Sequence, residues 1–511
     1  MAKCLLVYVP GGGPQVADLL PQEELASAAA YIRQAGHEPL ILDFGGIGGG
    51  EGSGGEAPQR RGWLQRITGR ATDASGATEI AARLQAVVSS FLGGLDLVAF
   101  LVHERDGLAM STQVNMSLQR GLEGVRTVCF GGYAERFGAY ISAYNPVFEA
   151  CVVEEAGAVL AGILNTPELG WSGMPGLVIR ERSGTVFTGH IARPDRGAPR
   201  PLPDYSEAVY PQLYSGEKLL YFPVQLFNNP AVAPSVLGRV RNIIEHVGGA
   251  AIHFVCGNAG AEQVEALGRG LAGLPGLGPC SLELGVPALA QLTPGLLRDM
   301  GGVAVRLAMH TGSQRLLDDF FAAGFTITDI ETACRRARAE GAAVHAEFAF
   351  PSPWDDHHTE AETLRLVQRV SPEGVTLREA QPMPGTAWYA DPKRFGLRLE
   401  HRQLARRAAC AGIGKSVPEG YAMPRGAAAL ATAIGDAGVA TGLSVHELTC
   451  ARALGAGPGI PSRAALLRDA LLRERGEAGR AAMGVINAAI LGAAHPDVQE
   501  GPARIRAAMG N

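Results

Sequence analysis

Apolar residues in the first part of the chain form short, nearly continuous runs, and the segments between them repeat apolar residues at helical spacing. Such runs are typical of strands buried on both faces of a sheet. The expected strands are 3–10, 39–44, 95–102, 125–132 and 150–155. The expected helices are 23–37, with Gly36 as its stop, 77–93 and 113–122. This alternation predicts a doubly wound, Rossmann-like parallel sheet with helices on both faces.

Further apolar segments follow, each separated from the next by a helical pattern. They are 219–226, 250–256, 279–285, 303–309, 343–350 and 375–380. Parallel strands joined by helices in this way predict a partial, TIM-like barrel of six βα units. In such a barrel the active site lies at the carboxyl ends of the strands.

The remaining segments complete the expected α/β architecture. Residues 174–190 predict a small hairpin that turns at Ser183-Gly184, and the Ala- and Leu-rich end of the chain predicts helices only. We therefore expect four parts. They are a sheet domain at 1–165, a connector at 166–217, a barrel at 218–395 and a helical domain at 396–511.

Composition narrows the function classes. The chain has 511 residues and a net charge of −5 from 45 basic and 50 acidic residues, with no basic stripe to indicate a nucleic-acid partner. No run of about 18 uncharged apolar residues predicts a membrane span. The first residues lack the features of a signal peptide, so we expect a cytoplasmic protein. The eight cysteines show no CxxC or CxxxC spacing, which fits a reducing compartment.

Glycines and polar residues follow the strands of the first domain. Ligands of doubly wound sheets bind at these carboxyl ends, so the residues there are candidate ligand contacts. They are Gly12, His103, Glu104, Ser111, Thr112, Gly131, Gly132, Tyr133 and Glu154. No GxGxxG opens the first helix, which weakens the hypothesis of a bound dinucleotide.

Four segments of this region carry a family resemblance. They are PQEELASAAAYIRQAGHEPLILD, DLVAFLV, VCFGGYAERF and VVEEAGAVLAGIL. In this order they resemble the cobalamin-binding domain that precedes many radical S-adenosylmethionine enzymes. The resemblance implies bound cobalamin, with Gly131 and Gly132 letting the backbone approach its nucleotide tail. The D-x-H-x-x-G motif, which supplies a histidine to cobalt in other cobalamin folds, is absent. The resemblance therefore implies that cobalamin would be held base-off without that histidine ligand. His103 is either a residue that approaches cobalt or an ordinary polar loop histidine.

The resemblance continues into the second part of the chain. RPLPDYS resembles the lead-in to radical S-adenosylmethionine barrels, and AQPMPGTAWY resembles their exit, so the similarity spans about 1–395. One departure is decisive. Where these enzymes have Cys-x-x-x-Cys-x-x-Cys, this chain has Asn229, Ala233 and Val236. Alanine and valine cannot ligate iron. We therefore expect no [4Fe-4S] cluster and no radical initiation.

Polar residues nevertheless follow the barrel strands. We take His310, Glu347 and Glu379 as the candidate catalytic residues, with Cys256, Asn258, Glu283, Arg306 and Arg378 near them. One alternative is a metal held by His310 and Glu347 with Asp355 and His357 or His358. Adjacent residues in the run DDHH cannot all face one ion, so a helix start capped by Asp or Thr359 is the simpler interpretation. We expect no resident metal and a pocket for a small-molecule substrate.

These observations leave three functions open. The first is a cobalamin-dependent enzyme that moves a methyl or other alkyl group, or rearranges a small natural-product-like substrate, with S-adenosylmethionine as a candidate methyl source. The second is a degenerate accessory protein that binds cobalamin or a partner. The third keeps the barrel pocket for S-adenosylmethionine or another small ligand without cobalamin. A decayed site should fill with apolar residues, because buried unpaired charges are costly, and this favours a working pocket.

Overall fold

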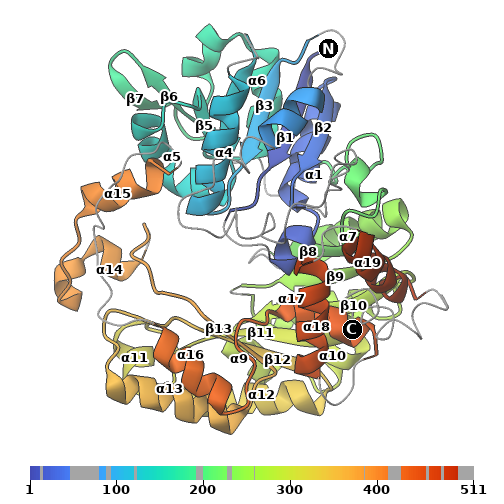
Figure 1. Ribbon diagram of the computed structural model, residues 1–511, viewed down its shortest axis with the longest axis vertical. Coiled ribbons are helices and arrows are strands. Elements are labelled where there is room, and N and C mark those ends of the chain that lie inside the picture. Colours follow the sequence, from blue (N-terminus) through green and yellow to red (C-terminus); the bar gives the residue numbers. More distant parts are fainter. Residues whose placement is uncertain are drawn as a thin grey trace, which may run out of the picture. The chain divides into compact units, whose positions relative to one another are not determined.

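The computed structural model describes most of the chain as two compact units (Figure 1). One unit consists of Met1–Lys218 with Leu399–Gly420, and the other of Leu219–Arg398 with Tyr421–Asn511. The described residues are 1–11, 15–45, 80–87, 94–119, 124–191, 200–226, 233–257, 259–384, 386–411, 427–455, 460–473 and 477–492. This division differs from the four expected parts. It groups the connector 166–217 with the first unit and divides 396–511 between both.

The first unit is built on a seven-stranded sheet in the order β2-β1-β3-β4-β5-β6-β7. Its parallel strands are β1 (Lys3–Tyr8), β2 (Glu38–Asp43), β3 (Leu97–Leu101), β4 (Arg126–Phe130) and β5 (Ala150–Val152). Right-handed crossovers place α1 (Glu23–Gln34) on one face and α4 (Arg105–Leu118) and α5 (Gly132–Tyr144) on the other. The doubly wound prediction is confirmed for this part of the chain.

Two details of the first unit extend the prediction. The expected hairpin is present as β6 (Leu177–Glu181) and β7 (Gly184–Phe187), but it pairs antiparallel with β5 and so enlarges the sheet. Helix α1 ends before Gly36, whose φ of 84° is the left-handed conformation expected of a helix stop. Helix α6 (Ala156–Asn165) packs against α1.

The second unit contains a six-stranded parallel sheet in the order β13-β12-β11-β10-β9-β8. Its strands are β8 (Tyr221–Gln225), β9 (Ala250–Val255), β10 (Leu277–Leu284), β11 (Gly302–His310), β12 (Ala343–Phe348) and β13 (Gly374–Leu377). The connecting helices include α7 (Ala233–Val247), α8 (Ala261–Leu271), α9 (Val286–Gln291), α12 (Ile327–Ala339) and α13 (His357–Val370). Every strand pairs with the next one in sequence, as the partial (βα)6 barrel requires.

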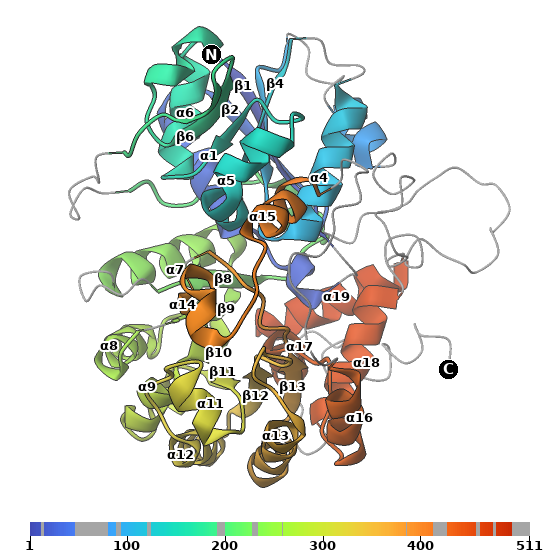
Figure 2. The same cartoon turned by 90° about the vertical axis from the view of Figure 1, so that its left-hand side faces the viewer.

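The helices at the end of the chain do not form a separate layer. Helix α15 (His401–Ala409) packs on α5 in the first unit. The other four, which belong to the second unit, are α16 (Ala428–Asp436), α17 (Val445–Ala453), α18 (Ile460–Arg473) and α19 (Glu477–Ile490). Figure 2 shows α8, α9 and α12 along one side of the sheet and α17 on the other, where it packs against β10, β11 and β12.

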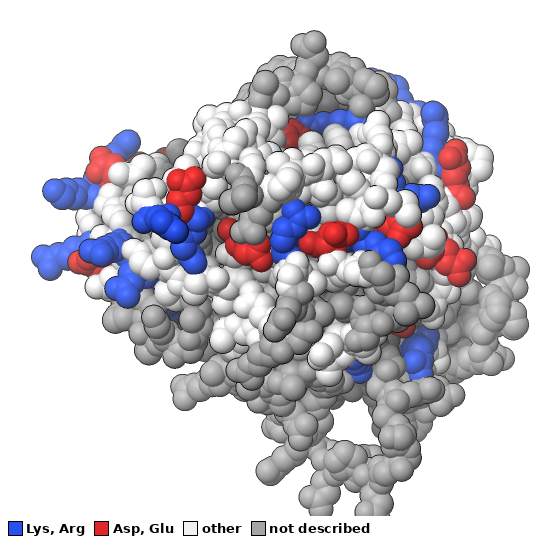
Figure 3. Space-filling view, turned by 90° about the horizontal axis from the view of Figure 1, so that it is seen from above, with Lys and Arg blue, Asp and Glu red and all other residues white. Residues whose placement is uncertain are grey.

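Two surface properties complete the description. Within the described residues, no helix combines the length and apolar character needed to cross a membrane. On the face that Figure 3 shows, acidic and basic side chains are interspersed.

Candidate active site and cofactor edge

On the side of the second sheet that faces α17, many of the alternating positions carry polar or charged side chains. Strands alternate their side chains between two faces, so residues two apart share a face. The residues of this face are Ser281, Glu283, Arg306, His310, His345, Glu347, Thr376 and Arg378. Parallel register places Glu283 directly beside Arg306, and Ala308 directly beside Glu347. The alternation therefore brings several charges together near the carboxyl ends of β10–β13.

These charges form one ionic network. Arg306 donates Nη1 to Oε2 of Glu283 at 2.8 Å and Nη2 to Oε2 of Glu347. Arg378 places its Nε 3.0 Å from the same oxygen of Glu347. The side chains of Glu283, Arg306 and Glu347 are 25%, 20% and 18% exposed. Partial burial strengthens each charge pair relative to a pair in water, so this network holds two carboxylates in fixed positions.

His310 lies at the end of β11 beside this network. Its ring is nearly parallel to the ring of Phe321, with centroids 5.1 Å apart, and to that of Phe325, at 6.1 Å. Burial lowers the pKa of His310, and the negative charge of Glu347 raises it by a smaller amount. The imidazole is therefore neutral at pH 7, where it can accept a proton.

The structure brings together two of the three predicted catalytic residues. His310 pairs in register with Phe348, the residue next to Glu347, and the charge of Glu347 acts on the pKa of the imidazole. Glu379 is exposed, and no hydrogen bond or ion pair among the described residues joins it to the network. Strand alternation explains this, because Glu379 follows Arg378 directly and so points to the opposite side. Cys256 lies at the end of β9, but its thiol is buried and directed toward the carbonyl oxygen of Phe254. Asn258, also considered there, lies outside the described residues.

The run DDHH starts a helix, as the simpler interpretation expected. Asp356 caps α13 by accepting hydrogen bonds from the backbone N–H groups of His358 and Thr359 at 2.8 and 2.9 Å. Asp355 is buried and accepts a hydrogen bond from the Thr359 hydroxyl at 2.9 Å. Within the part of the chain that is described, no three His, Cys, Asp or Glu side chains form a group that could hold a metal.

A buried layer of histidines lies deeper on the same face, and sequence reasoning missed it. His253 in β9 contacts the hydroxyl of Ser281 at 2.7 Å, and its ring lies 4.8 Å from that of His446 in α17. His345 in β12 contacts the hydroxyl of Thr376 at 3.0 Å. Burial lowers the pKa of all three histidines, to about 3 for His345 and His446. The alternation of polar and apolar residues in β9–β13 was the sequence signal that could have revealed these histidines.

The positions expected to carry cluster cysteines follow β8 and extend into the first turn of α7. Val236 is buried in α7, Ala233 is the first residue of that helix, and Asn229 lies outside the described residues. All eight cysteines of the chain are buried free thiols. The sequence places none of them in this loop.

At the carboxyl edge of the first sheet, Gly131 is required by its conformation and its packing. Its φ is 98°, and a Cβ atom there would lie 2.7 Å from Cδ1 of Leu101 and 3.0 Å from the carbonyl oxygen of Val102. Gly132 is less constrained, since a Cβ atom would meet only Arg136, at 3.7 Å. Gly12 lies outside the described residues.

Several predicted cofactor contacts have partners within the first unit. Nε2 of His103 lies 3.1 Å from Oε1 of Gln22 and 3.3 Å from the carboxylate oxygen Oε2 of Glu24. Glu154 accepts the backbone N–H of Ile191 at 2.7 Å and a hydrogen bond from His190. Glu104 precedes α4 and is exposed. These contacts favour a polar loop histidine, because Nε2, one of the two ring nitrogens that could bind cobalt, is already engaged.

Thr112 and Tyr133 are likewise occupied. The hydroxyl of Thr112 accepts a hydrogen bond from Nδ2 of Asn145 at 2.9 Å. The hydroxyl of Tyr133 donates to the carbonyl oxygen of Ala408 in α15 at 3.2 Å. Both side chains are buried and both hydroxyls already have a partner, so each stabilises packing within the unit and neither hydroxyl is left for a ligand.

Ser111 provides the observation that fits a bound ligand. Its side chain is fully buried in α4, and its hydroxyl has no hydrogen-bond partner within the described residues. A buried hydroxyl without a partner is costly, and a polar ligand group would remove that cost. Together with the glycine backbone at 131–132, this hydroxyl makes the residues of the edge compatible with a cobalamin tail.

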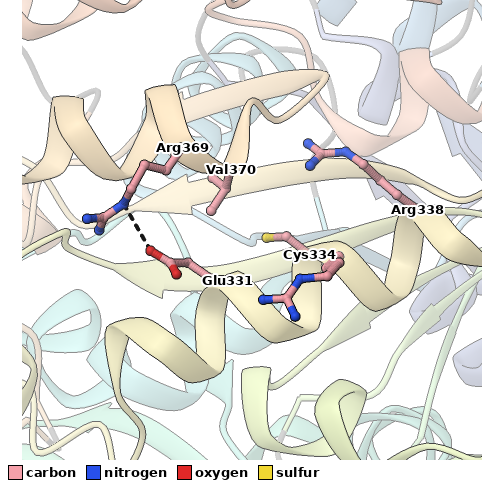
Figure 4. Close-up of a pocket in the computed structure, with 6 residues that line it drawn as sticks. Glu331, Cys334, Arg338, Arg369 and Val370 are labelled. Carbon is pink, nitrogen blue, oxygen red and sulfur yellow. Dashed lines mark ion pairs between the residues drawn. The ribbon is translucent and has the colours of Figure 1, made fainter.

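A small pocket of about 270 Å³ lies elsewhere, between α12 and α13 (Figure 4). Arg369 pairs there with Glu331 at 2.9 Å. The residues that line the pocket are Glu331, Cys334, Arg335, Arg338, Arg369 and Val370. None of them belongs to the network at the strand ends, so this pocket is separate from the candidate active site.

Comparison with solved structures finds the same fold in two cobalamin-dependent enzymes. One is the radical S-adenosylmethionine methyltransferase TsrM from Kitasatospora setae with cobalamin and a [4Fe-4S] cluster bound. It matches with a TM-score of 0.51 and 13% identity, over 74% of this chain and 72% of its own. The other is OxsB, a cobalamin-dependent S-adenosylmethionine radical enzyme with aqua-cobalamin bound. It matches with a TM-score of 0.53 and 12% identity, over 100% of this chain and 83% of its own.

No protein-family model and no curated protein matches the sequence. At these identities the two structures establish the fold. The chain has the fold of the cobalamin-dependent radical S-adenosylmethionine enzymes, as its sequence resemblance predicted.

Proposed function

We propose that this protein is a cobalamin-dependent enzyme that transfers a methyl or other alkyl group to a small substrate by polar chemistry, without an iron–sulfur cluster. The observation that carries the proposal is the intact network of Glu283, Arg306, Glu347 and Arg378 at the strand ends of a barrel that lacks the cluster cysteines. Charged side chains at partly buried positions are costly to keep unless they are paired or used.

The first unit supports the cofactor assignment through its own residues. The hydroxyl of Ser111 and the backbone at Gly131 and Gly132 would hold the cofactor. Cobalamin, when bound, supplies a centre that carries an alkyl group and releases it by polar transfer, so that no radical initiator is needed. S-adenosylmethionine is the first methyl donor to supply, because the enzymes that share this fold use it.

The second unit supports acid–base chemistry. Alkylation of an N–H or O–H group on the substrate forms a bond from that heteroatom to carbon, and the heteroatom's proton must go to a base. Glu347 and neutral His310 are two such bases. Arg306 binds Glu347 and Glu283 at once and so orients the carboxylates. Glu379 has no role in this proposal.

The test is a binding and activity experiment on the purified chain. After incubation with hydroxocobalamin and desalting, we expect a retained corrinoid spectrum with no stoichiometric iron, and methyl transfer from S-adenosylmethionine in a substrate screen. The variant Gly132→Val should still fold, because the structure has room for a Cβ atom at this position. It should lose the corrinoid, because its side chain would occupy the space that the cofactor needs at this edge. Gly173→Val is the matched control, because a Cβ atom there meets nothing within 4 Å.

Each other outcome points to a different function. Stoichiometric iron would contradict the cluster-free proposal. Retained corrinoid with no transfer to any substrate would support an accessory protein. Absence of both corrinoid and iron would leave a barrel pocket that serves another small ligand.

A further inference from the structure

The C-terminal end of α15 lies at the carboxyl edge of the first sheet. The hydroxyl of Tyr133 donates to the carbonyl oxygen of Ala408 at 3.2 Å. Nε of Arg105 donates to the carbonyl oxygen of Arg407 at 3.4 Å. Tyr133 is the second residue of α5, and Arg105 is the first residue of α4. These two helices begin just after β3 and β4 end, so the end of α15 lies across the edge where ligands of doubly wound sheets bind.

Polar contacts hold α15 in this place, beside α5 (Figure 1 and Figure 2). The last carbonyl oxygens of an α-helix have no hydrogen-bond partner inside it. Helix α15 ends at Ala409, so the two hydrogen bonds from α4 and α5 satisfy carbonyl oxygens of its last turn. In addition, the guanidinium carbon of Arg406 lies 5.5 Å from the ring centroid of Tyr144, the last residue of α5.

The apolar contact that holds α15 is small. The buried residues of the helix are Ala405, Ala408 and Ala409, and each contributes a single methyl group. Hydrophobic stabilisation grows with the apolar area that is buried, and elements with few buried apolar contacts open more easily than the core. The chain before Leu399 and after Gly420 belongs to the second unit. Helix α15 therefore stays tethered at both ends when it leaves α5.

We infer that α15 is a retaining strap of the corrinoid site. It closes the edge at the beginnings of α4 and α5, and it must leave α5 before the corrinoid can enter or dissociate. The helix whose first residue binds the strap also carries Ser111, the buried hydroxyl without a partner among the described residues. This inference rests on the proposed function and names the segment that controls exchange of its cofactor.

The experiment measures two rates on the full chain. The first is the dissociation rate of the corrinoid, followed as the absorbance retained when the protein is loaded with hydroxocobalamin and desalted at successive times. The second is the amide hydrogen exchange of residues 401–409 without corrinoid. Tyr133→Phe removes one hydrogen bond to the strap, so we expect both rates to rise about fivefold. Thermal unfolding checks that each variant folds.

A second variant separates the strap from a direct contact between Tyr133 and the corrinoid. Ala405 lies on the buried face of α15, and leucine at this position overpacks the contact with the first unit. We expect Ala405→Leu to raise both rates about fivefold or more. Tyr140→Phe is the matched control, since Tyr140 is an exposed tyrosine of the same helix as Tyr133. It should change neither rate.

The outcomes distinguish the strap from the cofactor assignment. Faster hydrogen exchange with an unchanged dissociation rate would overturn the inference and leave the proposed function standing, and so would unchanged hydrogen exchange in both variants. Faster dissociation in Tyr133→Phe but not in Ala405→Leu would overturn it in favour of a direct contact between Tyr133 and the corrinoid. A natural chain that retains no corrinoid would contradict the cobalamin assignment, and the strap with it.

Discussion

Arg306 donates Nη1 to Oε2 of Glu283 at 2.8 Å, and the two residues are direct partners in the register between β10 and β11. The same guanidinium also binds Glu347 on the next strand. One arginine therefore separates two carboxylates that would otherwise repel each other across the sheet. The arrangement fixes the position of Glu283 relative to Glu347, the carboxylate that we propose as a base.

Substitution of Arg306 should expose this dependence. Arg306→Met leaves both carboxylates without their shared cation, and we expect the free energy of unfolding to fall by about 2–4 kcal/mol, because a half-buried charge loses its partner. Glu283→Gln alone should cost about 1 kcal/mol. The measurement is a double-mutant cycle by urea unfolding, with a coupling energy of about 1–2 kcal/mol expected between the two sites. Additive effects would contradict a direct interaction.

The buried histidines should make the second unit sensitive to acid. The folded pKa of His345 and of His446 is about 3, well below the usual value near 6.5. At acidic pH the unfolded chain then binds more protons than the folded chain. The contribution of these histidines to the free energy of unfolding is therefore complete above about pH 6.5 and falls as the pH is lowered. At pH 5 each of these histidines should cost about 2 kcal/mol relative to pH 8.

The measurement is urea unfolding between pH 5 and 8 for the natural chain and for His446→Phe. The variant should reduce the pH slope by about one proton, since one buried imidazole no longer needs to stay neutral. His357→Gln is the control, because His357 is exposed at the start of α13. An unchanged slope in His446→Phe would show that this histidine takes up protons equally in both states.

Much of the fold was predictable because its signals are local. Nearly continuous apolar runs mark strands buried on both faces, and both sheets follow from them. His310 and Glu347 were candidates because polar residues at barrel strand ends are conspicuous, and the structure places both at the ends of β11 and β12. Glu379 was a candidate for the same reason, but it is exposed, and strand alternation turns it away from the side of Arg378.

The contacts that the sequence did not reveal are all long-range. His446 meets His253 only because α17 packs against the sheet. Thr112 in α4 meets Asn145, the residue after α5, although 33 positions separate them in the chain. No local pattern marks either pair. A long-range contact also separates α15 from the other C-terminal helices. Helix α15 packs on α5, which lies far earlier in the chain.

A buried ion pair in the first unit gives a further prediction. Nζ of Lys218 lies 2.6 Å from Oδ2 of Asp43, and both side chains are fully buried. Lys218→Met leaves a buried carboxylate without its cation, so we expect a loss of about 3–5 kcal/mol. The double variant Lys218→Met with Asp43→Leu should recover at least half of that loss, because the Asp43 carboxylate no longer stays buried without its cation. Urea unfolding measures both, and a double variant as unstable as the single one would contradict the account.

His310 allows stability and catalysis to be separated. Asparagine tolerates the left-handed conformation better than alanine does. The free energy of unfolding should therefore be about 0.5–1 kcal/mol higher for His310→Asn than for His310→Ala. Both variants lack the imidazole, and both should lose methyl transfer by about 100-fold or more if that ring moves a proton. The pH profile of the residual rate should lose the limb that belongs to His310. Full activity in His310→Ala would leave Glu347 as the base and remove the histidine from the chemistry.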